Sequence, residues 1–192
     1  MTTRWCLAVS VAGAAVLAFG SPAATPASAG RTPPQLYRAL QTKPFKPATV
    51  AGRFGDARLS TISPSPTAAR YGAIGTVQVT FGKGEGSIRY TVFRSRARAF
   101  NSWADDISGA ATPVLTFEQR LLVRGLPVTA VMFLGALGAC DPAPCPDTRA
   151  TFVSGVVQAD VTVTVRPNAS NWDRVAASAL VRAAYAHLKS SQ

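Results

Sequence analysis

Arginine is the one residue type that gathers in this sequence at a spacing that suggests chemistry. Four of them fall within ten positions: Arg89, Arg94, Arg96 and Arg98. Phe93 and Phe100 interleave with these arginines, so that charged and aromatic side chains share the stretch. Because a positively charged face attracts anionic surfaces, we interpret the four arginines as a candidate binding site for an anionic partner. The alternative is that they are the solvated edges of a strand and a helix.

Residues suited to catalysis form no recognisable pattern. The sequence has no GxSxG motif, and its one histidine, His187, falls beside the apolar stripe of an expected helix, where packing is its usual role. Asp105 and Asp106 are neighbours on another expected helix, so their side chains point about 100° apart and do not share a substrate. We therefore predict no catalytic residue and no enzymatic activity. A hydrolase is the least supported class.

Cysteine usage predicts a disulfide rather than a metal site. Two cysteines follow the first 29 residues, Cys140 and Cys145, in the segment CDPAPC. A zinc ion held by two thiolates needs two further ligands, and the sequence offers one histidine. An even number of cysteines in an exported chain is typical of disulfide bonding. We predict a bridge between Cys140 and Cys145, with no bound metal and no cofactor.

The first 29 residues have the pattern of a secretory signal peptide. Arg4 supplies a positive charge, residues 6–19 form an almost uninterrupted apolar stretch, and residues 27–29 have the Ala-Ser-Ala pattern of a cleavage site. We expect cleavage near Ala29 and a protein that is secreted, either extracellular or in the cell envelope. The alternative is that the segment is not cleaved and remains as a membrane anchor.

The charge balance narrows the choice of partner. Lys and Arg number 20 against 9 Asp and Glu, which gives a formal net charge of +11. Such a protein is attracted to anionic lipid, to acidic glycopolymers or to an envelope protein, whereas export argues against nucleic acid. The alternative interpretation is that the charge only keeps the protein soluble. We expect a monomer.

The segment 30–71 is expected to hold one short helix and a long loop. Thr32, Pro33 and Gln35 have the types and spacing of a capping box, which predicts a helix that ends near Pro44. The following residues are rich in Pro, Gly, Ser and Thr and show no sustained period, apart from a short strand near 58–62.

The segment 72–192 is expected to form an α+β domain, and residues 30–192 together one globular unit. Alternating apolar residues predict strands at 75–81 and 88–94, and a helical period then predicts a helix from Ala97 to about Ser108. A second hairpin is predicted from strands at 117–123 and 128–134.

The last part of the chain repeats the order strand, strand, helix. Strands are predicted at 150–153 and 156–166, with Gln158 and Asp160 on a wet face of the second strand. A helix is predicted from residue 171 to about 189. Its apolar stripe is predicted to include Trp172, Val175, Ala176, Ala179, Leu180, Ala183 and Leu188.

These elements predict an α+β fold with two ββα units. The sheet should be largely antiparallel, with about six strands and with helices packed on it. The function favoured by the composition is that of a secreted, non-enzymatic protein of the envelope or extracellular space that binds an anionic component through its basic face. The alternative is a carrier that holds a small apolar ligand between sheet and helices.

The order of elements resembles that of known proteins. A short N-terminal helix, the hairpin GTVQVTF…IRYTVF, the stretch RSRARAF entering a helix, and the final helix ALVRAAYAHL are similar to small exported actinobacterial proteins of unassigned function. The order is also similar to the Mog1/PsbP-like α/β/α sandwich of some mycobacterial envelope lipoproteins, although this chain lacks their lipid-bearing cysteine. The resemblance implies a fold and carries over no functional residue.

Overall fold

The computed structural model describes residues 30–45, 57–82, 86–108, 115–137, 145–164 and 174–192. The predicted signal peptide lies outside the described residues, and so does Cys140 of the predicted disulfide. Within the described ranges no helix is long and apolar enough to cross a membrane.

All the described strands belong to one antiparallel sheet. Seven strands lie in the order β1-β2-β3-β7-β6-β5-β4, and each neighbouring pair is antiparallel. The strands are β1 (Ala57–Ile62), β2 (Ala73–Phe81), β3 (Gly86–Phe93), β4 (Leu115–Leu122), β5 (Ala130–Leu137), β6 (Cys145–Ser154) and β7 (Val157–Thr164). The predicted fold class is therefore confirmed, with one strand more than the six expected. The short strand expected at 58–62 is β1.

The sheet consists of two meanders joined at one ladder. Strands β1, β2 and β3 pair in chain order, and so do β4, β5, β6 and β7. The two sets meet where β3 pairs with β7, from Gly86 opposite Val163 to Val92 opposite Val157. The ladder β3–β7 therefore holds together two halves of the sheet that are far apart in the sequence.

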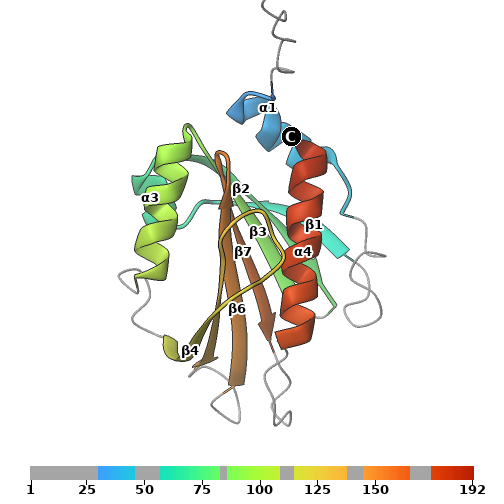
Figure 1. Ribbon diagram of the computed structural model, residues 1–192. Helices are drawn as coiled ribbons and strands as arrows, with labels where there is room; N and C mark the ends of the chain where they lie inside the picture. Colours follow the sequence, from blue (N-terminus) through green and yellow to red (C-terminus); the bar gives the residue numbers. More distant parts are fainter. Residues whose placement is uncertain (1–29, 46–56, 83–85, 109–114, 138–144, 165–173) are drawn as a thin grey trace, which may run out of the picture.

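Helices cover both faces of the sheet. They are α1 (Pro33–Thr42), α2 (Pro66–Arg70), α3 (Arg96–Ile107) and α4 (Arg174–Ser191). Helices α1 and α4 pack on one face, while α2 and α3 pack on the other, so the described part has three layers (Figure 1). Helix α2 was expected to be loop. It forms because the Ser65 hydroxyl accepts a hydrogen bond from the Ala68 N–H, with Pro66 in the first turn.

The face under α1 and α4 holds the main hydrophobic core. Alternate strand residues point to it, and the Tyr90 hydroxyl at its centre donates to the carbonyl of Ala184 at 3.1 Å. Burial raises the pKa of Tyr90 well above its usual value. The completely buried apolar residues of the strands on this face include Val77, Val79, Ile88, Val92, Phe152, Ala159 and Val161.

The face under α2 and α3 carries the polar residues that the alternation predicts, but it is covered where it was expected to be wet. Gln158 and Asp160 were expected on a wet face of β7, but Gln158 is only 3% exposed because α3 covers it. Thr76 and Thr91 are buried on the same face, and their hydroxyls are hydrogen-bonded at 3.1 Å. A layer of polar side chains is thus enclosed between the sheet and α3.

The apolar stripe of α4 matches the prediction at Leu180, Ala183 and Leu188 and differs from it in the first turns of the helix. Val175 was expected to face the core, yet it is 83% exposed. The buried apolar residues of the helix are Ala177, Leu180, Val181, Ala183, Ala184 and Leu188. The helix has small apolar residues on several sides, so the period of the sequence alone did not fix which side faces the sheet.

Both predicted ββα units are present. The first is β2, β3 and α3, and the second is β6, β7 and α4. Their helices pack on opposite faces of the sheet, because α3 covers Gln158 whereas α4 lies on the side of the neighbouring Ala159. The repeated order of elements is therefore not a repeated three-dimensional unit.

The N-terminal segment is tied to the end of α4. The Arg31 guanidinium donates to the Ser191 carbonyl at 2.5 Å, and the Lys43 ammonium donates to the Ser190 carbonyl. The last carbonyls of a helix have no partner within the helix and carry partial negative charge, so two cations stabilise this end. Helix α1 adds Leu36 and Leu40 to the core.

Helix α1 also packs tightly on β2, at Gly75. A Cβ atom added to this glycine would lie 2.4 Å from the ring of Tyr37. We predict that Gly75→Ala lowers the free energy of unfolding by about 1–3 kcal/mol, because the ring must move away. The measurement is urea unfolding followed by circular dichroism.

Two variants control this experiment. The double variant Gly75→Ala/Tyr37→Leu should lose less stability than the sum of its single changes, since the ring that meets the new methyl group is gone. Gly30→Ala should change stability by less than about 0.5 kcal/mol, because nothing lies within 4 Å of that position. Strict additivity of the two changes at 75 and 37 would show that the close packing is not the cause.

Candidate anion-binding surface

Three of the four predicted arginines lie within five positions at the start of α3, although Arg96 and Arg98, two apart in the helix, point to different sides of it. Ser95 caps the helix by accepting a hydrogen bond from the Arg98 N–H at 3.4 Å. Arg94 precedes the cap, while Arg96 and Arg98 lie in the first turn, and all three are exposed. The Arg98 guanidinium lies over Gly72, where an added Cβ atom would be 2.3 Å from it. We call Arg94, Arg96 and Arg98 the arginine face.

Arg89 is not part of the arginine face. It lies in the middle of β3, opposite Gln78 on β2 and Asp160 on β7. It is five residues before Arg94, which corresponds to about 16 Å along a strand. Arg89 is exposed, but the nearest charged side chain across the ladder is the carboxylate of Asp160. Arg89 was predicted to belong with the other three because it is close to them along the chain, but an extended strand separates it from them in space.

The charges of α3 are reversed with respect to its dipole. A helix carries partial positive charge at its N-terminus, yet the first turn of α3 has Arg96 and Arg98 and no acidic residue. Its two acidic residues, Asp105 and Asp106, lie in the last turns. Each charge at the unfavourable end costs about 0.3–1 kcal/mol at low salt. Other parts of the molecule compensate the two aspartates.

Asp105 is compensated from α2 and the residue that follows it. The carboxylate accepts hydrogen bonds from the Arg70 guanidinium at 2.8 Å and from the Tyr71 hydroxyl at 2.5 Å. The hydrogen bond to Asp105 raises the pKa of Tyr71 above its usual value. Arg70 also lies 5.2 Å from the centre of the Tyr71 ring. These contacts join α2 to α3.

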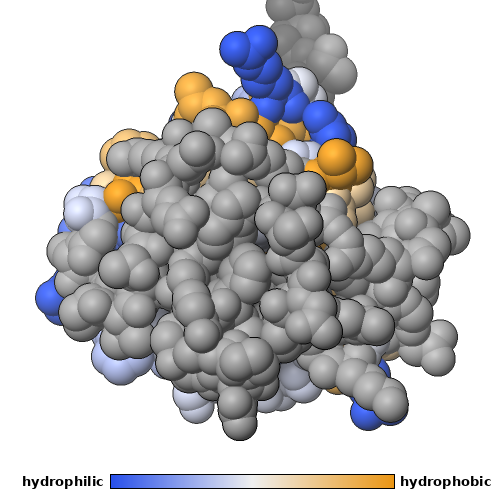
Figure 2. Space-filling model, turned by 90° about the horizontal axis from the view of Figure 1, so that it is seen from below, coloured by the Kyte–Doolittle hydropathy of each residue, from blue (hydrophilic) through white to orange (hydrophobic). Residues whose placement is uncertain are grey.

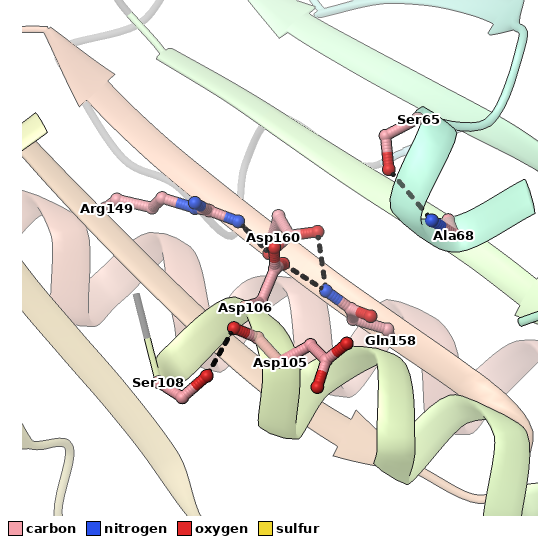
Figure 3. A network of polar contacts seen from close by, with 8 residues as sticks. All are labelled: Ser65, Ala68, Asp105, Asp106, Ser108, Arg149, Gln158 and Asp160. Atoms are coloured by element: carbon pink, nitrogen blue, oxygen red, sulfur yellow. Dashed lines mark hydrogen bonds and ion pairs between the residues drawn. The ribbon is translucent and has the colours of Figure 1, made fainter. Parts of the chain in front are cut away.

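Asp106 is compensated from the sheet, in a cluster that Figure 3 shows from close by. Its carboxylate accepts hydrogen bonds from the Arg149 guanidinium at 2.8 Å and from the Gln158 amide at 2.6 Å. Arg149 also pairs with Asp160, at 3.1 Å. Asp105, the preceding residue on the helix, takes no part in this cluster and bonds Arg70 and Tyr71 instead. The four residues Asp106, Arg149, Gln158 and Asp160 are called the carboxylate cluster below.

Burial and like charge act on the carboxylate cluster together. Burial under α3 and the nearby Asp160 raise the pKa of Asp106, while Arg149 and Gln158 act in the opposite direction. Burial alone would lower the pKa of Arg149, but the charges of Asp160 and Asp106 outweigh it and raise that pKa. The three charged side chains are between 15% and 19% exposed. One guanidinium thus serves two enclosed carboxylates.

The contacts of the carboxylate cluster are directed at its own members. Each of the two aspartates bonds both Arg149 and Gln158. In the described part of the chain, no three His, Cys, Asp or Glu side chains converge as they would around a metal ion. The arrangement can fasten a helix to a sheet. Asp106 and Asp160 were predicted in separate elements, and their meeting was not foreseen. The signal that could have indicated it is Asp160 itself, an acidic residue inside a strand of valines.

His187 packs in the core, as expected, beside a small hollow. Its ring lies 5.0 Å from that of Phe45 and 5.7 Å from that of Tyr90, and its Nε2 atom is buried without a hydrogen-bond partner. Burial and then the charge of Lys43 lower the pKa of His187 from 6.5 to about 4. The hollow of about 240 Å³ lies between Lys43–Phe45 and the last turns of α4.

A second hollow, of about 450 Å³, lies at the other side of the same helix end. Its lining includes Arg31, Lys189 and the turn between β6 and β7. Both hollows lie on the surface around α4 and not between sheet and helices. Neither of these two hollows is the cavity between sheet and helices that a carrier of an apolar ligand needs.

The predicted disulfide remains a prediction. Cys145 begins β6, and the strand runs on from it through Pro146. Cys140 lies outside the described residues, so Cys145 is the one cysteine in the part of the chain that the structure describes. The strand predicted at 150–153 thus begins five residues earlier than expected, and Cys145 and Pro146 already pair with β5.

Comparisons with known proteins place few limits on this chain. The sequence matches no protein family, and no curated protein matches it. Among solved structures, the chain is similar to the extracellular domain of PknH from Mycobacterium tuberculosis. The sequences are 13% identical, the TM-score is 0.44, and the match covers 77% of this chain and 94% of that chain.

The carboxylate cluster predicts an asymmetry between its members. Arg149→Met should lower the free energy of unfolding at pH 7 by about 3–5 kcal/mol, because it leaves two enclosed carboxylates without their cation. Asp106→Asn should cost less than about 1 kcal/mol, since Asn still accepts hydrogen bonds and one of the two like charges is removed. Urea unfolding measures both. The exposed Arg182→Gln is the control, and a loss for Arg149→Met no larger than for this control would contradict the account.

The buried His187 predicts a loss of stability in acid. Its pKa is lowered in the folded state, so the folded protein binds fewer protons than the unfolded chain between pH 6.5 and about 4. The contribution is complete above pH 6.5, and about 2–3 kcal/mol should be lost as the pH falls to 4. Unfolding free energies measured at pH 7 and pH 4.5 check this.

The variant His187→Phe isolates the histidine from other groups that titrate. It should show a smaller loss between the two pH values, because a phenyl ring binds no proton. The raised pKa of Asp106 has the opposite sign and adds stability as the pH falls, so it does not imitate the effect. An equal acid loss in His187→Phe and the parent would refute the assignment.

Proposed function

We propose that this protein is a secreted, non-enzymatic protein of the cell envelope or extracellular space that binds an anionic component through the arginine face. The observation that supports the proposal is which of the charged side chains at α3 form ion pairs and which do not. Within the described residues, Asp105, Asp106 and Asp160 pair with arginines, whereas Arg94, Arg96 and Arg98 form no ion pair with a carboxylate. The unbalanced cations are therefore at the surface.

The position of these cations adds to the argument. Arg96 and Arg98 stand at the positive end of the helix dipole, where they are held against an electrostatic cost. An anion at this end would interact with both the guanidinium groups and the free N–H groups of the first turn. In Figure 2 hydrophilic side chains project from the rim of the molecule beside hydrophobic ones.

Secretion rests on the pattern of residues 1–29, and the class of partner rests on the net charge of +11. An anionic lipid, an acidic glycopolymer or an acidic envelope protein has the required charge. The proposal needs no cofactor and no bound metal. It also needs no second copy of the chain.

The proposal predicts that binding depends on the position of the charges and on salt. The sample is residues 30–192, which contain every described element. The triple variant Arg94→Gln/Arg96→Gln/Arg98→Gln should bind anionic vesicles and soluble poly-glutamate at least tenfold more weakly than the parent at low salt. Binding of the parent should fall as salt rises, because the screening length shortens to about 8 Å at 0.15 M. Co-sedimentation and titration calorimetry measure these affinities.

A matched control removes the same charge from other places. Arg38→Gln/Arg58→Gln/Arg182→Gln changes three exposed arginines on α1, β1 and α4 and should keep most of the binding. The arginine-face variant should also unfold at equal or higher urea concentration, since it relieves repulsion at the helix end. If both triple variants lose binding equally, net charge alone is responsible and the arginine face has no special role.

A further inference from the structure

A half-exposed aromatic side chain stands beside the arginine face. Phe100 of α3 is 53% exposed. The other exposed large hydrophobic residues of the described part are aliphatic and lie on β1, β4 and α4: Leu59, Leu122 and Val175. A single exposed apolar residue needs no explanation, but an exposed phenyl ring on the same side of a helix as an exposed arginine, Arg96, points to an amphipathic surface.

The ring of Phe100 is held in an outward position. It lies 5.6 Å from the ring of Trp103, with an angle of 46° between the planes. Trp103 is only 7% exposed and packs against Val131 and Phe133 of β5. Phe100 therefore rests on a buried side chain of the same helix that is itself packed against the sheet, and its own ring stays half-exposed.

Phe100 and Arg96 share one side of the helix. Residues four apart lie one above the other along a helix, and both of these are exposed. Ala97 and Asn101 are exposed on the neighbouring side, so the first two turns of α3 present a surface without an acidic residue. This surface has the apolar ring of Phe100 with the guanidinium of Arg96 one turn away, while Arg98 points to another side of the helix, over Gly72.

From this arrangement we infer that the anionic partner is the surface of a phospholipid membrane, and that Phe100 enters its interface. The inference rests on the proposed function and names its partner. A membrane surface has anionic headgroups and apolar chains within a few ångströms of each other, which matches an exposed phenyl ring one turn from Arg96 at the basic end of α3. A soluble acidic polymer would bind the arginines and leave the ring in water.

The expected binding is reversible. Each basic residue near an anionic surface strengthens binding about fivefold, and burial of one phenyl ring adds about tenfold. Attachment by three arginines and one ring therefore depends on both the electrostatic attraction and the burial of the ring. Removal of either contribution should weaken binding measurably.

The first test uses residues 30–192 and two kinds of vesicle at 0.15 M salt, phosphatidylcholine alone and a mixture with 30% phosphatidylglycerol. Phe100→Ala should bind the mixed vesicles about tenfold more weakly than the parent. Phe100→Leu, which stays apolar, should keep most of the affinity. Leu122→Ala removes an exposed apolar side chain on β4 and should change nothing.

The second test places the helix in the membrane. In a Trp172→Phe background Trp103 is the one tryptophan of residues 30–192, and it lies next to Phe100. Brominated lipids in the mixed vesicles should quench its fluorescence by at least a third in the parent. Circular dichroism of each variant confirms that it is folded.

The outcomes separate the inference from the proposed function. If Phe100→Ala binds mixed vesicles as the parent does, or if Trp103 is not quenched, the membrane inference is wrong. In that case the proposed function still stands if the arginine-face variant loses its binding to poly-glutamate. Poly-glutamate binding that exceeds vesicle binding would also reject the membrane in favour of a soluble polymer or an acidic protein. If Phe100→Ala loses poly-glutamate binding to the same extent, the ring acts through the fold and the inference fails.

Discussion

The ion pairs of Arg149 with Asp106 and Asp160 hold α3 against the sheet, and the exposed surface of α3 depends on them. The strand face below this helix combines a polar layer at Gln158 and Asp160 with apolar residues, Val131 and Phe133, that pack against Trp103. A guanidinium with two carboxylates supplies directed contacts. Because the last turns of α3 are fixed in this way, its first turn and Phe100 keep a constant position toward solvent.

Much of the fold could be predicted because its signals are local. Alternation of apolar residues located the strands to within a few positions, and the capping residue Thr32 located α1. Helix α2 has a local signal too, Ser65 followed by Pro66, but five residues are too short for a periodic pattern. The orientation of α4 has no local signal in the sequence. Val175 and Ala177 are both apolar enough for a core, and only the packing of the whole helix against the sheet decides which of them is buried.

The candidate site was predictable only in part, for the same reason. Arg94, Arg96 and Arg98 are close in the sequence, and a turn into a helix keeps them close in space. Asp106 and Asp160 come from a helix and a strand of different units, so no spacing links them. Their meeting depends on which face of the sheet α3 covers, and that choice appears nowhere in the periodicity of either element. Gln158 was assigned to solvent on the same local evidence.

The ladder between β3 and β7 separates the sheet into two meanders, and this division affects how the chain folds. Each meander can pair its strands through short connections, but every contact across this ladder joins residues about 70 positions apart. Closing so long a loop has an entropic cost that the local hairpins do not share, and contacts of this kind slow folding. The sheet is thus two fragments held along one edge, with the connection through α3 as their covalent link. A chain cut in that connection would retain two complete meanders with complementary edges, which is the geometry required for fragments to reassociate.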